Sequence, residues 1–166
     1  MARVTFKGNP INTSGALPGV GSRAPDFTLV AADLSEKTLA DYAGKKKVLT
    51  INPSYDTGVC QATARKFNES LSARADVVLL AISRDLPFAQ KRFCEAEGLK
   101  NVVSLSSFRS SFGKDYGLDL VDGPLKGLTA RAVLVLDEKN DVLVSQLVPE
   151  IVNEPDYAAV SAALGR

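Results

Sequence analysis

The chain has 166 residues, with 20 lysines and arginines against 19 aspartates and glutamates, a formal net charge of +1 and no histidine. This balance argues against nucleic acid or an anionic membrane as a partner, and the length suits a single domain, residues 1–166. Without histidine, Cys-His hydrolases, Ser-His-Asp hydrolases and imidazole-dependent zinc sites are excluded. No apolar run can span a bilayer and no secretory signal is visible, so we expect a soluble, cytoplasmic protein.

The N-terminal part of the chain predicts a hairpin and short strands. Two apolar runs flank Lys7-Gly8-Asn9-Pro10, which predicts a β-hairpin in an N-terminal extension of residues 1–20. Lys45, Lys46 and Lys47 are expected to form a solvated lead-in to the next strand. The strands predicted in this part are Val4–Phe6, Ile11–Thr13, Asp26–Val30 and Lys37–Leu39.

From residue 48 onward, strands and helices alternate. An α/β domain with a central mixed sheet flanked by helices is therefore expected, and a thioredoxin-like arrangement fits the order. The predicted strands are Val48–Ile51, Val77–Ile82, Val102–Leu105, Ala132–Leu136 and Val142–Leu147. Three helices are predicted from their apolar faces: Val59, Thr63, Phe67 and Leu71; Leu86, Ala89, Phe93 and Ala96; and Tyr157, Val160 and Leu164. Pro155 is expected in the first position of the third helix.

Cys60 has the most informative position of any residue in the chain. Pro53 ends the strand before it, and Asp56, Thr57 and Gly58 supply turn and N-cap chemistry. Cys60 is therefore expected in the first turn of a helix that begins at the carboxyl end of a buried strand. The unpaired N–H groups and the helix dipole favour a thiolate there. A buried, inert thiol is an equally general interpretation of this position.

Cys94 is the second of the two cysteines. It is expected on a helix, one position away from the apolar stripe and partly accessible. Two thiolates alone cannot form a closed structural zinc site or hold a usual iron–sulfur cluster. Their separation also differs from the Cys-x-x-Cys spacing of thioredoxin-type exchangers. In a cytosolic chain such a pair is either unrelated or a transient redox couple.

Two groups of motifs give the chain its resemblance to a known family. Pro53, Thr57 and Cys60 form Pro-x3-Thr-x2-Cys, and residues 21–27 read Gly-x-x-Ala-Pro-Asp-Phe. Together these resemble peroxiredoxins. The segments DTGVCQATARKFN, SRDLPFAQKRFCEAEGL, NVVSLSSFR, GPLKGLTARAVLVLDE and LVPEIVNEPDYAA are similar to the bacterial thiol peroxidase branch, an atypical 2-Cys class, and the similarity extends over nearly the whole chain.

The resemblance implies a role for each matching position in a thioredoxin-like fold. Cys60 would be the peroxidatic cysteine, whose thiolate attacks a peroxide oxygen and becomes a sulfenic acid. Thr57 would orient thiolate and peroxide, and Pro53 would shield the thiolate from water. Arg131 would supply a fixed positive charge that stabilises the thiolate and the leaving oxygen. Without the resemblance, we would interpret Arg131 as a surface ion pair and Thr57 as an N-cap alone.

The resemblance also implies that Cys94 resolves the sulfenic acid by forming an intrachain disulfide with Cys60. Because the cysteines are expected on separate helices, we predict that the turn at Cys60 and the helix of Cys94 unwind locally on oxidation. The implied substrates are hydrogen peroxide and alkyl hydroperoxides, the implied reductant is thioredoxin and the implied assembly is a homodimer. No cofactor or metal is implied.

Two residues depart from the pattern of the thiol peroxidase family, and three other functions compete with the peroxidase interpretation. Tyr55 and Arg84 stand where smaller or less charged residues are expected, which could alter substrate entry or reductant docking. A cysteine phosphatase is disfavoured because four residues, and not the required five, separate Cys60 from Arg65. A redox-sensing module would use the same Cys60–Cys94 disulfide without rapid turnover. A binding module with inert cysteines would leave Thr57 and Arg131 without a shared purpose.

Overall fold

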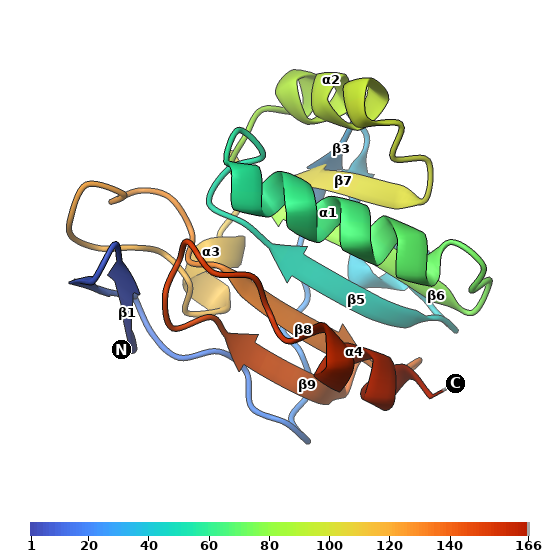
Figure 1. Cartoon of the computed structure of the whole chain (residues 1–166). Coiled ribbons are helices and arrows are strands. Elements are labelled where there is room, and N and C mark those ends of the chain that lie inside the picture. The colour runs from blue at the N-terminus through green and yellow to red at the C-terminus, as the bar shows by residue number, and fades with distance from the viewer. Residues whose placement is uncertain (166) are drawn as a thin grey trace.

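The structure, a computed structural model, describes residues 1–165, whose strands form a two-stranded hairpin and a seven-stranded sheet (Figure 1). The order in the larger sheet is β4-β3-β7-β6-β5-β8-β9. The strands are β1 Arg3–Phe6, β2 Asn9–Asn12, β3 Leu29–Ala31, β4 Glu36–Lys37, β5 Lys46–Ile51, β6 Val77–Ser83, β7 Val102–Ser106, β8 Ala132–Leu136 and β9 Val142–Leu147. The helices are η1 Leu39–Tyr42, α1 Gly58–Leu71, α2 Pro87–Glu97, α3 Phe112–Asp115 and α4 Tyr157–Leu164.

The large sheet is mixed, as the alternating pattern predicted. Strands β5, β6 and β7 are parallel, whereas β8 pairs with β5, β9 with β8 and β3 with β7 in antiparallel fashion. The predicted N-terminal hairpin is confirmed, with Val4 opposite Ile11. Among the described residues, no helix is long and apolar enough to cross a membrane.

The sheet has an apolar layer on each face because successive strand residues point to opposite sides. One layer packs beneath α1 and α4, which both lie in front of the sheet in Figure 1. It comprises Val48, Leu79, Val133 and Val135 of the strands with Phe67, Val160 and Leu164 of the helices. The larger layer lies on the other face and includes Leu49, Ile51, Leu80, Ile82 and Leu134 together with Phe27, Phe112 and Tyr116.

The register of β5 determines what faces the start of α1. Ile51, the last residue of β5, pairs with Ala132, the first residue of β8. Because these strands are antiparallel, the residue before Ala132 lies beside the residue after Ile51. Arg131 and Asn52 are therefore brought together at the carboxyl end of β5, where α1 begins.

The expectation of a solvated lysine lead-in is confirmed for the exposed Lys45 but was wrong for Lys47. Lys46 and Lys47 belong to β5, and Lys47 is completely buried. Its ammonium donates to the carbonyl oxygens of Asp137 and Glu138 at 3.5 and 3.4 Å, which satisfies the buried charge. Burial lowers the pKa of Lys47, although nearby Asp137 and Glu138 oppose this shift.

The predicted apolar stripe of α2 was also wrong, by one helical position. Leu86 is 51% exposed, whereas Pro87 and Gln90 are buried. Gln90 can face inward because its amide nitrogen donates to Leu105 O and Ser83 Oγ, each at 3.0 Å. Cys94, four residues after Gln90, follows the same face and is half-buried, which agrees with its predicted partial accessibility.

Several predicted boundaries need smaller corrections. The strand predicted at Lys37–Leu39 is β4 at Glu36–Lys37, and Leu39 begins η1. β3 begins at Leu29 and not at Asp26, because the Asp26 carboxylate accepts from the backbone N–H groups of Phe27 and Leu39 and holds the chain in a loop. In α4 the N-cap is Asp156, whose carboxylate accepts from Ala159 N. Pro155 therefore precedes the cap and does not occupy the first helical position.

Candidate active site

Cys60 lies in the first turn of α1, as predicted, and its side chain is fully buried. Thr57 is the N-cap of this helix, and its hydroxyl accepts from Cys60 N at 3.3 Å. The same hydroxyl donates to Ser54 O at 3.2 Å. These bonds fix the threonine side chain and the first helical turn relative to the cysteine.

Arg131 directly contacts the cysteine sulfur. Its Nη1 donates to Cys60 Sγ at 3.0 Å and to Asn52 Oδ1 at 3.1 Å, and its Nε donates to Ile151 O at 2.8 Å. The arginine is 2% exposed, and no carboxylate among residues 1–165 forms an ion pair with it. Burying a charge is costly unless it is paired or hydrogen-bonded, and Cys60, Asn52 and Ile151 supply the acceptors for this guanidinium.

Asn52 is a site residue that the sequence reasoning missed. It is 1% exposed, and its amide is oriented by donation from Nδ2 to Thr50 O at 3.2 Å. Its Oδ1 is thereby directed at Arg131. A polar residue directly after the buried strand β5 and before Pro53 was the available signal, but sequence alone does not show which strand pairs with β5.

A small apolar pocket of about 150 Å³ opens onto the Thr57 and Arg131 side chains that contact Cys60. Pro53, as predicted, lies at this site, and it is buried. The rest of the wall comes from three separate segments: the N-terminal hairpin, the long loop before Arg131 and the loop after β9. The lining residues are Phe6, Pro53, Ser54, Thr57, Val59, Leu125, Leu128, Arg131, Ile151 and Val152.

Cys94 forms no disulfide with Cys60, and both cysteines are free. Cys94 is seven residues beyond Pro87, the start of α2, which places it about 10 Å along the helix axis. It lines a different pocket, of about 360 Å³, between α2 and β7. Burial raises the pKa of the Cys94 thiol, and a hydrogen bond with Ser104 partly offsets that effect.

Tyr55 and Arg84, the two residues that depart from the family pattern, both make side-chain contacts, but only Tyr55 is buried. Tyr55 is 2% exposed and its ring stacks on Phe93 of α2. Arg84 pairs with Asp119 at 2.6 Å, which links the loop before α2 to the long loop preceding Arg131. Neither residue lines the apolar pocket at Thr57 and Arg131.

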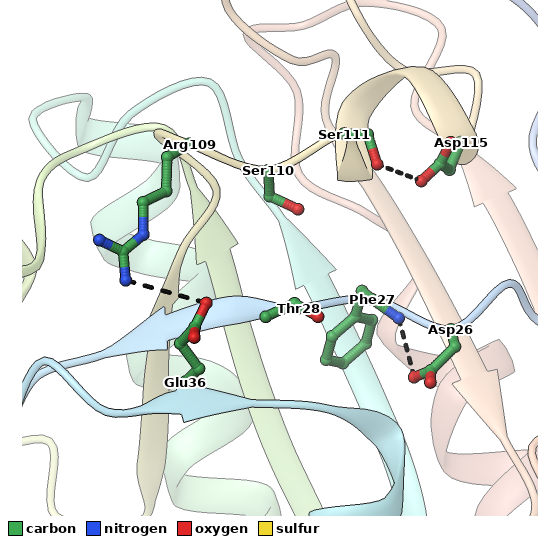
Figure 2. A pocket seen from close by; sticks show the side chains of 8 residues that line it. All are labelled: Asp26, Phe27, Thr28, Glu36, Arg109, Ser110, Ser111 and Asp115. Carbon is green, nitrogen blue, oxygen red and sulfur yellow. Dashed lines mark hydrogen bonds and ion pairs between the residues drawn. The ribbon is translucent and has the colours of Figure 1, made fainter.

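A polar pocket of about 370 Å³ is lined by residues 26–28, which precede β3, by Glu36 of β4 and by Arg109, Ser110, Ser111 and Asp115 (Figure 2). Figure 2 shows that its polar groups bond to one another, with Arg109 paired to Glu36 and Ser111 donating to Asp115. Neither cysteine lines it. Within residues 1–165, no group of three or more His, Cys, Asp and Glu side chains is placed to hold a metal ion.

Comparison with known proteins agrees with this geometry. The redoxin family model matches residues 19–161. A thiol peroxidase from Mycobacterium tuberculosis (strain CDC 1551 / Oshkosh) is 52% identical over 165 residues, which cover 99% of each chain. The chain belongs to the bacterial thiol peroxidase family. Its activity is therefore the thiol-dependent reduction of peroxides.

Solved structures support the thiol peroxidase assignment and the thioredoxin-like fold. A peroxiredoxin-like protein from Aquifex aeolicus superposes with a TM-score of 0.91 at 42% identity, covering 96% of this chain and 94% of its own. A thiol peroxidase from Chromobacterium violaceum superposes with a TM-score of 0.90 at 25% identity and the same coverage. Each superposition covers 96% of this chain, which includes nearly all of the sheet and its flanking helices.

Proposed function

We propose that this chain reduces organic hydroperoxides and hydrogen peroxide through Cys60 as the peroxidatic cysteine. The contact between Arg131 Nη1 and Cys60 Sγ, at 3.0 Å, is the observation that supports this most strongly. A buried guanidinium that forms no ion pair with a carboxylate of residues 1–165 favours a thiolate and remains available for a second negative charge. Thr57 and Pro53 line the pocket through which a peroxide would approach.

In the first step, the Cys60 thiolate attacks one oxygen of the peroxide. A sulfur–oxygen bond forms, the oxygen–oxygen bond breaks, and the leaving alkoxide takes a proton to become an alcohol. The sulfur is oxidised to a sulfenic acid while the peroxide is reduced. Arg131 stabilises the charge that passes from sulfur to the leaving oxygen, and the Thr57 hydroxyl orients the peroxide.

In the second step, Cys94 attacks the sulfenic acid sulfur, and an intrachain disulfide forms with release of water. The pair must come within the Cα separation of roughly 4.4–6.8 Å that a disulfide needs. Because Cys94 lies well along α2, the start of α1 and the end of α2 unwind locally for this step. A thioredoxin-type dithiol then reduces the disulfide by thiol–disulfide exchange.

The apolar pocket points to hydroperoxides that carry an alkyl or aryl group. Its wall includes Phe6, Leu125, Leu128 and Ile151, which can bury such a group beside Thr57 and Arg131. Hydrogen peroxide would use the same reacting groups without that apolar contact. We further propose that the chain acts as one domain, assembles as a homodimer and works in the cytoplasm.

Steady-state turnover of cumene hydroperoxide, with thioredoxin, thioredoxin reductase and NADPH, tests the proposed function. Wild type should consume NADPH over many equivalents of hydroperoxide, because each disulfide is reduced again. Cys60→Ser should consume none above background, since the sulfur nucleophile is gone. A single equivalent consumed by wild type, with no further turnover, would contradict the peroxidase and favour the redox-sensing module.

Replacing Asn52 with leucine should slow the reaction with cumene hydroperoxide about 10-fold, because Arg131 loses one of its two protein oxygen acceptors. Stopped mixing followed by intact mass gives the rate of sulfenic acid formation in a Cys94→Ser background. Thr50→Val is the matched control, because Thr50 Oγ1 is buried without a partner among the described residues. Equal rates for Asn52→Leu and Thr50→Val would show that Asn52 does not position Arg131.

A further inference from the structure

The Tyr55 side chain connects the segment that carries Cys60 with the helix that carries Cys94. It projects from the turn between β5 and α1, five residues before Cys60. Its ring stacks on Phe93, the residue before Cys94, with centroids 4.9 Å apart and planes at 15°. Tyr55 is 2% exposed and Phe93 is half-buried, so this aromatic contact is largely shielded from solvent between the turn before α1 and the helix α2.

A polar contact ties the same turn to the loop before α2. Asp85 accepts from Tyr55 N at 2.7 Å and from Ser54 Oγ at 2.8 Å. Ser83 Oγ also donates to the Asp85 carboxylate, at 2.9 Å. The turn before Cys60 is thus attached to the start of α2 through Asp85 and to its last turns through Phe93.

The Tyr55 hydroxyl is buried without a hydrogen-bond partner among residues 1–165. Burial raises the pKa of Tyr55 well above its ordinary value, and the nearby Cys94, Asp85 and Cys60 add to this shift. Both sulfur atoms therefore lie close enough to influence the phenol. An unsatisfied hydroxyl opposes the closed arrangement, because opening would return it to water.

We propose that Tyr55 is a positioning residue that sets the rate of disulfide formation. Its stack on Phe93 holds α2 closed, and Cys94 away from Cys60, while the peroxide reacts. Release of the stack lets Cys94 reach the sulfenic acid. The Cys94–Cys60 bond then forms as the sulfur–oxygen bond breaks, and the hydroxide leaves as water with the Cys94 proton. This inference rests on the proposed function of the two cysteines.

Burial of Cys94 supports this order of events. In the closed form, burial raises the pKa of the Cys94 thiol, which disfavours the thiolate that must attack the sulfenic acid. Opening of α2 would expose the thiol to solvent and remove the effect of burial. The Tyr55–Phe93 contact thus controls both the distance between the sulfurs and the reactivity of Cys94.

Two substitutions at Tyr55 separate the ring from the hydroxyl. Tyr55→Leu removes the stack, so conversion of sulfenic acid to disulfide should be about fivefold faster than in wild type. Tyr55→Phe keeps the ring and removes the unsatisfied hydroxyl, so this conversion should be about threefold slower. Excess hydroperoxide should then over-oxidise Tyr55→Phe more readily, because its sulfenic acid persists longer.

Rapid mixing of each reduced protein with cumene hydroperoxide, followed by intact mass, gives both rates. Sulfenic acid formation, measured in the Cys94→Ser background, should stay within about twofold of wild type in both variants, because Tyr55 does not line the apolar pocket. Phe93→Leu should reproduce Tyr55→Leu. Tyr157→Leu breaks a different Tyr–Phe contact, between α4 and Phe67 of α1, and should leave disulfide formation unchanged.

The outcomes distinguish this inference from the function on which it rests. Opposite changes in Tyr55→Leu and Tyr55→Phe, with an unchanged first step, support the positioning role. Disulfide formation that is unchanged in both variants, or shifted in the same direction by both, overturns it while leaving the peroxidase mechanism intact. If wild type forms no Cys60–Cys94 disulfide, the proposed function fails and this inference fails with it.

Discussion

Replacing Arg131 with methionine should slow the reaction of the reduced protein with cumene hydroperoxide by about 10²–10³-fold, the loss typical when one preorganised charge-stabilising donor is removed. Arg131 donates to Cys60 Sγ and is fixed by Asn52 Oδ1 and Ile151 O. Methionine retains the apolar stem but removes the charge that stabilises both the thiolate and the leaving oxygen. Stopped mixing with intact mass in the Cys94→Ser background measures this step alone.

Arg131→Lys is the matched control that separates the effect of the positive charge from the effect of the directed hydrogen bonds. Lysine keeps a positive charge but cannot make the same set of directed bonds to Cys60, Asn52 and Ile151. Its rate should therefore lie between those of wild type and Arg131→Met. Circular dichroism of each variant checks that the fold persists. A folded Arg131→Met protein that reacts within twofold of wild type would show that the arginine has a structural role only.

Replacing Cys94 with serine should separate the two chemical steps. The first addition of hydroperoxide should still convert Cys60 to a sulfenic acid, seen as the gain of one oxygen. Turnover with thioredoxin should fall by about 100-fold or more, because an intramolecular thiol is replaced by one that must arrive from solution. Cys60 is fully buried, so an external thiol has poor access to it.

The NADPH-coupled thioredoxin assay measures this loss of turnover, and intact mass identifies the species that accumulates. Cys94→Ala serves as a second variant, because serine could hydrogen-bond to Ser104 and retain part of the thiol's local structure. Both variants should accumulate the sulfenic acid. Turnover within twofold of wild type would mean that Cys94 is not the resolving cysteine.

The sequence predicted the β5–turn–α1 unit because its determinants are local. An apolar run, a proline, an N-cap threonine and helical spacing all lie within residues 48–71, and each acts on its neighbours. The structure accordingly has Thr57 as N-cap and Cys60 in the first turn. The contact of Arg131 with Cys60 is different, because it depends on β8 pairing with β5 and no local pattern specifies that pairing.

Hydrogen bonding explains two of the failed predictions. Lys47 and Gln90 are polar residues that polarity alone places on the surface, yet both are buried. Their donors reach carbonyl oxygens at strand ends and turns: Asp137 and Glu138 for the lysine, and Leu105 for the glutamine. Such partners come from distant segments, so sequence periodicity assigned α2 the wrong face.

The wall of the apolar pocket at Thr57 and Arg131 could not be predicted either, because it is also built from segments that are distant in the sequence. The hairpin predicted in residues 1–20 contributes Phe6, and the loop after β9 contributes Ile151. Glu150 joins these segments, because its carboxylate accepts from Gly8 N at 2.8 Å and from Lys7 N at 3.2 Å. This long-range contact turns an apparent extension of the chain into part of the candidate active site.

Rapid-mix intact mass of the reduced wild-type protein with one equivalent of hydroperoxide tests the central claim most directly, when followed by peptide mapping. The mechanism predicts a quick loss of two hydrogens and a single cross-linked species that joins the Cys60 and Cys94 peptides. Parallel mixing of Cys60→Ser should leave its mass unchanged. An unmodified wild-type protein, or an oxidised one in which Cys60 remains a free thiol, would contradict the assignment of Cys60 as the reacting residue.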